Sequence, residues 1–450
     1  MPSGIIRPLA KPPVLSGGQR RCPSDGDRFP LRMTLGMKIF RWFLPGLRIK
    51  RWILVILIAC AFAVIGAMSF MLYWQGIDAD YGVSGKSLLL VGATSAILAA
   101  FGLITGFYRL LKSLGELLER KDSGRGLVDI AYERRFLGGG PRVVALGGGT
   151  GMSALLSGLK HHTSEITAIV SMADDGGSTG KLRASLGVVP MGDIRKCLVA
   201  LADEEPMMRH LMNYRFADDE LDGHSFGNLL LTVLERVTGS FKEGVKEANR
   251  ILQVRGKVLP SAVEKLYLVA EHPDGTKTTG QRHICKTDKR IKRLELKPAP
   301  APAEEDVLSA IRNAELIILG PGSAFTSVMP NLLIKGIPET ISASDAIKVL
   351  VANVANSEGE TRGFTLTDHI QAFIDHTAPF RVFDYVLAAK PFNADLLEQI
   401  RAKDAEPVLR GDGPLPKDIE LIYADVVDEN EPTHHSPKKL SQALMDLLSE

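Results

Sequence analysis

Residues 142–151 read Arg-Val-Val-Ala-Leu-Gly-Gly-Gly-Thr-Gly, and this stretch decides the fold. The apolar run that begins it predicts a buried strand, and the glycines that follow predict a tight turn into a helix. Because glycine lets backbone N–H groups approach a phosphate closely, the turn is a candidate nucleotide site. Tight turns of this kind also need glycine for steric reasons alone, so the interpretation requires support from elsewhere. The candidate ligand contacts are Gly147, Gly148, Gly149, Thr150 and Gly151.

A second apolar run, residues 166–172, ends in Ala-Asp-Asp-Gly-Gly-Ser-Thr-Gly. The carboxyl ends of parallel strands share one crevice, so Asp174 and Asp175 are expected beside the glycine turn. Paired carboxylates near a phosphate site suit Mg²⁺, and these two are the candidate metal ligands; no other cofactor is indicated. A plain turn with a helix cap is the alternative. Other candidate contacts in this loop are Gly176, Gly177 and Ser178.

Three later loops also place glycine or polar residues at the mouth of an apolar segment, as ligand-binding loops do. They are residues 190–195, 223–229 and 320–331. A guanidinium in the first loop is suited to bidentate contact with a diphosphate, although it could equally pair with the neighbouring carboxylate. The histidine of the second loop could instead be a helix cap or a buried donor. The candidate ligand contacts here are Asp193, Arg195, His224, Asn228, Gly322 and Ser323.

Five motifs in this order resemble the YvcK/CofD-like family, and more closely its YvcK branch, called gluconeogenesis factors. They are Gly-Gly-Gly-Thr-Gly, Ala-Asp-Asp-Gly-Gly-Ser, Pro-x-Gly-Asp-x-Arg, Gly-His-x-x-Gly-Asn and Gly-Pro-Gly-Ser-x-x-Thr-Ser. The resemblance implies a UDP-sugar ligand and a role in carbon metabolism and in cell-shape or envelope maintenance. It further implies that residues 148–151 hold the diphosphate, that Asp174 and Asp175 hold a ribose, a metal or both, and that His224 and Asn228 reach the ligand from a helix N-terminus.

One loop departs from the pattern of the YvcK branch. Where that branch usually carries Thr-Gln-Pro-Gly-Glu-Thr, this chain has Asn356-Ser357-Glu358-Gly359-Glu360-Thr361. The second half matches, so Glu360 remains a candidate ligand residue. The first half differs, which affects the expected recognition of a base or a sugar.

Two enzymatic alternatives remain open. A CofD-type 2-phospho-L-lactate transferase would use the same diphosphate cradle and paired acids, with Mg²⁺, to move a phospholactyl group to a deazaflavin. An NAD(P)-dependent oxidoreductase would use the glycines as a dinucleotide fingerprint. The last glycine of that fingerprint comes one place early, because Met152 occupies its sixth position.

Two apolar runs, residues 53–73 and 88–108, are each long enough to cross a bilayer as a helix. We expect a membrane hairpin over residues 52–110, preceded by a basic, disordered tail over residues 1–51. Such a tail could bind nucleic acid, but the adjoining apolar runs favour a membrane instead. Basic residues flank both runs on their outer sides, while the hairpin loop holds Lys86 against Asp78 and Asp80. The positive-inside rule therefore places both ends, and the main domain, in the cytoplasm.

After a linker over residues 111–140, apolar runs alternate with helical patterns to the C-terminus. This alternation predicts a Rossmann-like, doubly wound parallel sheet over residues 141–450, with strands at 142–146, 166–172, 315–319, 348–354 and 383–389. Residues 191–254 interrupt it with a helical segment that carries an apolar stripe, and residues 257–297 with a small β insert. The predicted strands of the insert are 266–270, 281–286 and 291–296. The stripe, predicted to be buried, comprises Leu229, Leu230, Val233, Leu234 and Val237.

The composition agrees with a cytosolic globular domain joined to a membrane anchor. Hydrophobic residues make up 45% of the 450 residues, which is ample for a packed core. The 4 cysteines show no paired spacing, so neither a disulfide framework nor a zinc site is indicated.

Overall fold

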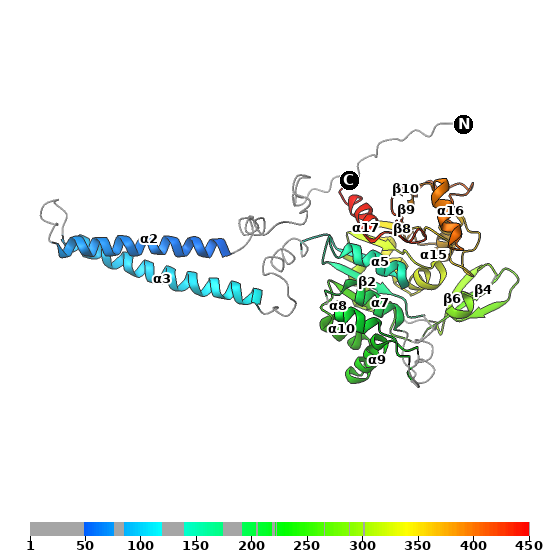
Figure 1. Cartoon of the computed structure of the whole chain (residues 1–450), viewed down its shortest axis with the longest axis horizontal. Helices are drawn as coiled ribbons and strands as arrows, with labels where there is room; N and C mark the ends of the chain where they lie inside the picture. Colours follow the sequence, from blue (N-terminus) through cyan, green and yellow to red (C-terminus); the bar gives the residue numbers. More distant parts are fainter. Residues whose placement is uncertain are drawn as a thin grey trace, which may run out of the picture. The chain divides into compact units, whose positions relative to one another are not determined.

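The computed structural model describes residues 49–75, 85–118, 139–173, 191–203, 206–217, 221, 223–264, 266–287, 289–299 and 302–449. These residues form two compact units, which divide between Arg135 and Phe136 (Figure 1). The first unit holds two long helices, and the second holds all the strands of the described part of the chain.

The N-terminal unit consists of α2 (Ile49–Trp74) and α3 (Gly85–Leu118). The two helices approach closely through small residues: a Cβ added at Gly102 would lie 2.8 Å from the Cβ of Ala59. Large apolar side chains such as Phe101 point outward, with 68% of that residue exposed. Residues 52–74 and 85–111 are long and apolar enough to span a membrane, by length and composition, so both predicted spans coincide with helices.

A seven-stranded parallel sheet forms the centre of the C-terminal unit, with the strand order β10-β9-β8-β7-β1-β2-β3. The predicted α/β fold is thereby confirmed. The order runs outward in both directions from β1 and β7, so the topological switch point lies between these two strands. A ligand is expected at the carboxyl ends of strands that flank such a point. The strands are β1 (Val143–Gly147), β2 (Ile166–Val170), β3 (Lys257–Pro260), β7 (Leu316–Leu319), β8 (Ile347–Val351), β9 (Tyr385–Ala389) and β10 (Glu420–Ala424).

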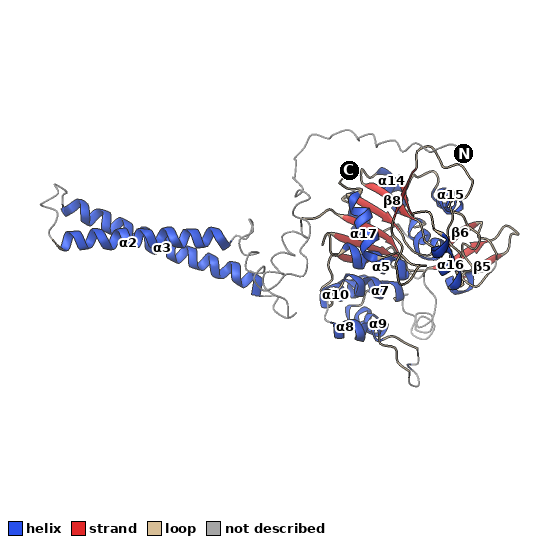
Figure 2. Cartoon of the chain, turned by 45° about the horizontal axis from the view of Figure 1, so that its top comes forward, coloured by secondary structure: helices blue, strands red, loops and turns tan. Residues whose placement is uncertain are grey.

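Helices cover both faces of this sheet (Figure 2), which is why its strands are nearly continuous apolar runs. Successive side chains of β1 alternate between two cores: Val143 and Ala145 belong to one, and Val144 and Leu146 to the other. The first core includes α5 (Gly149–Leu159), α7 (Gly192–Leu201) and α17 (Pro437–Asp446). The second includes α12 (Glu305–Arg312), α13 (Met329–Leu332), α14 (Ile337–Ala343) and α15 (Leu366–Thr377). A further helix, α16 (Ala394–Ala402), follows β9.

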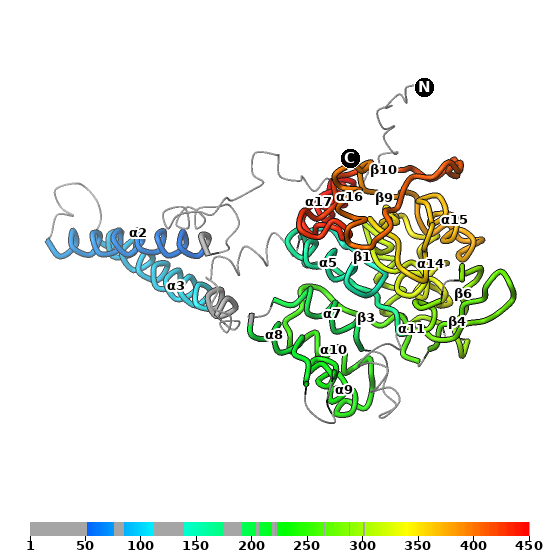
Figure 3. The backbone as a smooth tube through the Cα atoms, turned by 45° about the vertical axis from the view of Figure 1, so that its right-hand side comes forward, coloured from blue at the N-terminus to red at the C-terminus, as the bar shows by residue number. Residues whose placement is uncertain are grey.

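The predicted helical segment is present as α7, α8 (Pro206–Asn213), α9 (Phe226–Thr238) and α10 (Phe241–Ile251) (Figure 3). The predicted apolar stripe on α9 is only partly buried: Leu229, Leu230 and Leu234 pack against the core, whereas Val233 is 54% exposed and Val237 is 78% exposed. The buried face carries Leu231 and Thr232, and the hydroxyl of Thr232 lies 3.5 Å from the sulfur of Met191 at the start of α7. Packing against α7 therefore decides which side of α9 is covered.

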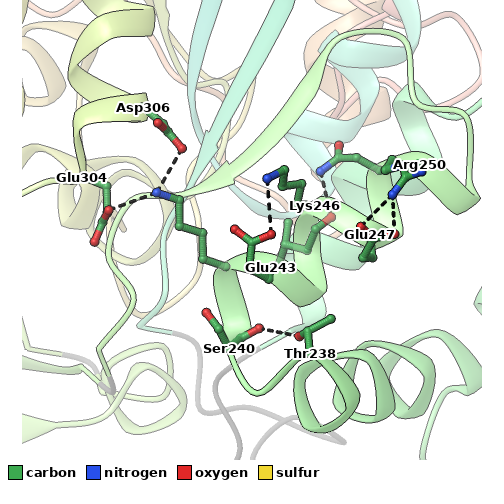
Figure 4. A network of polar contacts seen from close by, with 11 residues as sticks. Thr238, Ser240, Glu243, Lys246, Glu247, Arg250, Glu304 and Asp306 are labelled. Carbon is green, nitrogen blue, oxygen red and sulfur yellow. Dashed lines mark hydrogen bonds and ion pairs between the residues drawn. The ribbon is translucent and has the colours of Figure 1, made fainter.

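Ion pairs lie along α10, and those of Lys242 reach the start of α12 (Figure 4). The Lys242 ammonium lies 3.0 Å from a carboxylate oxygen of Glu304 and 3.0 Å from one of Asp306, both at the start of α12. These contacts raise the pKa of Lys242. Further pairs along the helix join Glu243 to Lys246 and Glu247 to Arg250. Pairs this exposed contribute little stability each, so we take them as guides to orientation.

The insert is a three-stranded antiparallel sheet in the order β5-β4-β6. It comprises β4 (Tyr267–Glu271), β5 (Lys277–Thr279), β6 (Arg293–Lys297) and the short helix α11 (Gln281–Ile284). The sequence had placed the residues from 257 onward in the insert, but β3 pairs with β2 in the main sheet. Residues 281–286 were predicted as a strand, but they begin with the helix α11. Gly280, at φ 94°, turns the chain out of the extended conformation just before this helix. The edge strand β10 was not predicted, since its side chains are only partly buried and its apolar run is short.

Candidate functional site

The glycine turn lies where β1 ends and α5 begins. Gly149 has φ +71°, a left-handed conformation that favours glycine. A Cβ added at Gly151 would lie 2.9 Å from the carbonyl carbon of Pro321, in the segment that follows β7. The two segments at the switch point are thus in contact through bare backbone, and Thr150 and Gly151 open the first turn of α5.

The segment after β7 is fixed by a side chain that the sequence analysis did not single out. Asn353, just beyond β8, accepts a hydrogen bond from the N–H of Gly322 at 3.1 Å and donates one to the Gly322 carbonyl at 2.8 Å. Ser323 then leads into a π-helical turn, η6 (Ala324–Val328), a type of element that is frequent at functional sites. The hydroxyl of Ser327, on this turn, lies 3.8 Å from where a Cβ of Gly149 would be. The one sequence signal for this role of Asn353 is its position just after the apolar run of β8.

Asp193 brings a carboxylate to the same turn. It lies in the first turn of α7, and one of its oxygens is 2.5 Å from where a Cβ of Gly148 would be. Any side chain at Gly148 would collide with this carboxylate. The Lys196 ammonium, one helical turn away, lies 3.3 Å from the other oxygen and partly neutralises it. A negative charge therefore stands at the glycine turn, next to the N-terminus of α5.

Arg195, His224 and Asn228 lie on the far side of α7, around the start of α9. Arg195 is 5% exposed and donates to the Met212 carbonyl at 3.2 Å and to the side-chain oxygen of Asn213. Burial lowers the pKa of its guanidinium. His224 and Asn228 are buried, and the N–H of Asn228 donates to Ser225 Oγ, the N-cap of α9.

Glu360 is buried behind the site, and its oxygens are turned toward protein donors. It accepts hydrogen bonds from the Thr326 hydroxyl at 2.6 Å, the Cys285 thiol at 3.2 Å and the Phe325 N–H at 3.3 Å. Burial raises the pKa of this carboxyl against the effect of those donors. Glu360 therefore joins the insert to the π-helical turn, and its geometry is that of a supporting residue.

The remaining candidate residues, Asp174, Asp175, Gly176, Gly177 and Ser178, lie outside the described residues. Within the described ranges no group of three or more His, Cys, Asp and Glu side chains is arranged to hold a metal ion. The candidate magnesium site stays a prediction, and Asp193 is the acid that the described residues bring to the turn.

Comparison with known proteins decides the family. Residues 143–427 match the family described as 2-phospho-L-lactate transferase CofD. The chain belongs to the CofD family. Its relatives include a "Gluconeogenesis factor" of Halalkalibacterium halodurans, 42% identical over 68% of this chain and 95% of that protein. Another "Gluconeogenesis factor", from Bacillus subtilis, is 39% identical over 70% of this chain and 100% of its own length. The predicted resemblance to the YvcK branch is thereby confirmed.

Two further comparisons extend this result. A protein of Nostoc sp. is 38% identical over 420 residues, which is 90% of this chain and 92% of that protein. A crystal structure of a UPF0052 family protein from Bacillus halodurans aligns with a TM-score of 0.63 and 42% identity, over 68% of this chain and 99% of that one. The C-terminal unit of this family member therefore has the fold of its relatives, and the name that its relatives share is gluconeogenesis factor.

Proposed function

We propose that this family member binds a nucleotide sugar of the UDP class at the carboxyl ends of β1 and β7. The observation that carries the proposal is the contact between the two glycine segments at the topological switch point, with Asp193 beside them. Bare backbone at such a point lets N–H groups approach a polar ligand closely, and a carboxylate there accepts hydrogen bonds from sugar hydroxyls.

We further propose that binding, and not turnover, is the contribution of this protein. The ligand-bound domain would act at the cytoplasmic face of the membrane, in carbon metabolism and in maintenance of the cell envelope. The names of the relatives support the metabolic role, and the two membrane-length helices support the location.

Thermal shift and titration calorimetry of the full chain in detergent test the binding. UDP-N-acetylglucosamine should raise the melting temperature, since a ligand at a hundredfold excess over its Kd adds about 2.7 kcal/mol to the free energy of unfolding. NAD, GDP and Mg²⁺ alone serve as the comparison. The variants Asp174→Asn and Asp175→Asn should bind more weakly while melting as the parent does. If NAD raised the melting temperature and the UDP-sugar did not, the oxidoreductase would be favoured and the UDP-sugar proposal rejected.

The family match favours a second candidate, a CofD-type transferase. In that reaction the acceptor hydroxyl of a deazaflavin attacks the phospholactyl phosphorus of a guanosine-linked donor, a new P–O bond forms, and GMP leaves. Mass spectrometry after long incubation with donor, acceptor and Mg²⁺ separates the two functions. Stoichiometric GMP release that Asp174→Asn abolishes would establish the transferase and reject binding alone.

A further inference from the structure

The first turn of α7 presents opposite charges on its two sides. Asp193 and Arg195 are two positions apart, which on a helix separates their side chains by about 200°. Asp193 meets Gly148 of the glycine turn, whereas the Cδ of Arg195 lies 2.6 Å from where a Cβ of Gly227 would be. Gly227 belongs to the first turn of α9. The carboxylate thus faces α5, and the guanidinium faces α9.

Arg195 is a buried cation with incomplete compensation. Its two hydrogen-bond acceptors, the Met212 carbonyl and the Asn213 amide oxygen, are both neutral. Its Nε is buried and has no hydrogen-bond partner in the described part of the chain. The Asp193 carboxylate compensates this charge only in part. Holding such a charge in a protein interior is costly, and a packed apolar side chain would avoid that cost. A guanidinium kept in this state is positioned for an anion.

A second guanidinium lies by the same helix end. The segments 214–216 and 224–226 pair in an antiparallel manner, since the Phe226 N–H donates to Tyr214 O and the Phe216 N–H donates to His224 O, each at 2.9 Å. Arg215, at the centre of the first segment, donates to the carbonyl of Gly223 at 3.1 Å. Arg195 donates to Met212 and Asn213, which come three and two positions before Arg215, so both arginines lie at this end of α9. Burial and the positive charge of Arg215 lower the pKa of Arg195, while the Asp193 carboxylate raises it. The N-terminus of α9, a helix of 13 residues, contributes a partial positive charge of its own.

We propose that Arg195, Arg215 and the first turn of α9 form an anion subsite that receives the diphosphate of the nucleotide ligand, while the glycine turn and Asp193 receive a hydroxyl-bearing sugar. This inference rests on the proposed function. The glycine motif alone suggests the opposite orientation of the ligand, with the diphosphate at the glycine turn. A phosphate at the glycine turn would lie against the Asp193 carboxylate, whose charge Lys196 neutralises only in part, and the two negative charges would repel each other.

Calorimetry on the full chain in detergent tests the subsite, with UDP and inorganic pyrophosphate as probes. We expect Arg215→Gln and Arg195→Gln each to weaken the binding of both probes at least tenfold. Arg195→Lys keeps the charge but loses the planar fork, so it should fall between the parent and Arg195→Gln. The matched control is Arg236→Gln, at the opposite end of α9, which should change binding less than twofold. Asp193→Asn should leave pyrophosphate binding intact or strengthen it, while weakening UDP-N-acetylglucosamine relative to UDP.

The melting temperature of each unliganded variant separates loss of binding from loss of folding, and Arg215, which is exposed, keeps the test usable if Arg195→Gln unfolds. Folded arginine variants that bind UDP and pyrophosphate as the parent does would overturn the subsite, even if the parent binds the UDP-sugar. Arginine-dependent binding of pyrophosphate without any binding of the UDP-sugar would uphold the subsite and reject the nucleotide-sugar function. A parent that binds the UDP-sugar but neither probe would reject the subsite alone, and a parent that binds none of the three would reject both.

Discussion

Individual buried residues stabilise the backbone of the candidate site through hydrogen bonds. Glu360 ties the thiol of the insert to the N–H and hydroxyl of the π-helical turn. Asn331, which is fully buried, donates to the carbonyl of Ser327 on the same turn at 2.9 Å. Residues such as these can belong to a sequence motif because they support the site, without contacting a ligand. The motif alone does not distinguish a supporting side chain from a ligand-binding one.

We expect Glu360→Gln to destabilise the C-terminal unit by about 1–3 kcal/mol, because the new amide cannot accept from all three donors. The effect depends on pH. Burial raises the folded pKa of Glu360, so its stabilising contribution is greatest below the unfolded pKa and is lost as the pH rises through the folded pKa. The deficit of the variant should therefore be larger near pH 5 than near pH 8 in thermal melts. Glu358→Gln, in the same loop but exposed, is the control, and an equal deficit in both variants would contradict this role.

Two buried histidines should make the protein sensitive to acid. Burial lowers the pKa of His369 and of His435 to about 4 each. The unfolded chain takes up these protons from about pH 6.5 downward while the folded chain does not, so stability falls as the pH drops from 6.5 through 4. Each shift corresponds to roughly 3 kcal/mol.

The variant His435→Gln should remove part of this pH dependence. Nε2 of His435 lies 3.1 Å from the carbonyl oxygen of Ala352, and the amide of glutamine supplies a replacement N–H donor. Melting temperatures between pH 8 and pH 4.5 measure the effect. His434→Gln, at the exposed neighbour, should keep the slope of the parent, and identical slopes for all three proteins would exclude His435 as a source.

At the scale of elements, small residues set the register of the two membrane-length helices. A Cβ added at Gly92 of α3 would lie 3.7 Å from the Cβ of Ser69 on α2, close to the mean separation of about 3.8 Å in disulfides. The close approach at Gly102 and Ala59 fixes the same antiparallel alignment further along the pair.

We therefore expect the pair Ser69→Cys and Gly92→Cys to form an intramolecular disulfide under mild oxidation in membranes. The native cysteines are replaced by alanine, and free thiols are counted with a maleimide-polyethylene glycol gel shift. The control pair, Ser69→Cys and Ala93→Cys, moves the second thiol by about 100° to an exposed side of α3 and should stay reduced. Equal cross-linking of both pairs would refute the register.

The sheet elements show what the sequence could and could not predict. Five strands were found because parallel strands covered on both faces are continuous apolar runs. Residues 257–260 were assigned to the insert, although they pair with β2 in the main sheet. This pairing joins segments that are far apart in the sequence, so the local residue pattern does not indicate it. The glycine turn was located correctly, and Asp193 was named as a candidate ligand contact. Its close approach to Gly148 was not predicted, because the packing of α7 against the glycine turn is a tertiary contact. Likewise, the exposure of Val237 depends on which face of α9 packs on α7.

At the scale of the whole molecule, the function depends on which side of the membrane the C-terminal unit occupies. Nucleotide sugars of the UDP class are made in the cytosol, so a domain outside the cell would meet no such ligand. Basic residues before the first span and after the second, with one lysine against two acids between them, predict both ends inside. Helices α2 and α3 pack against each other, and the guanidinium of Arg109 lies 5.5 Å from the centroid of the Trp52 ring, which places the start of α2 beside the later part of α3.

Single-cysteine variants in spheroplasts test this topology directly. In a chain without its native cysteines, Asp78→Cys lies in the loop between the spans and should react with a membrane-impermeant maleimide added from outside. Ser123→Cys, beyond the second predicted span, should react only after the membrane is permeabilised, because the positive-inside rule predicts that both ends of the chain are cytoplasmic. The reverse pattern would place the switch point of the sheet, and the proposed ligand site with it, outside the cell. Nucleotide-sugar binding would then have no cellular ligand, whatever the affinity measured in detergent.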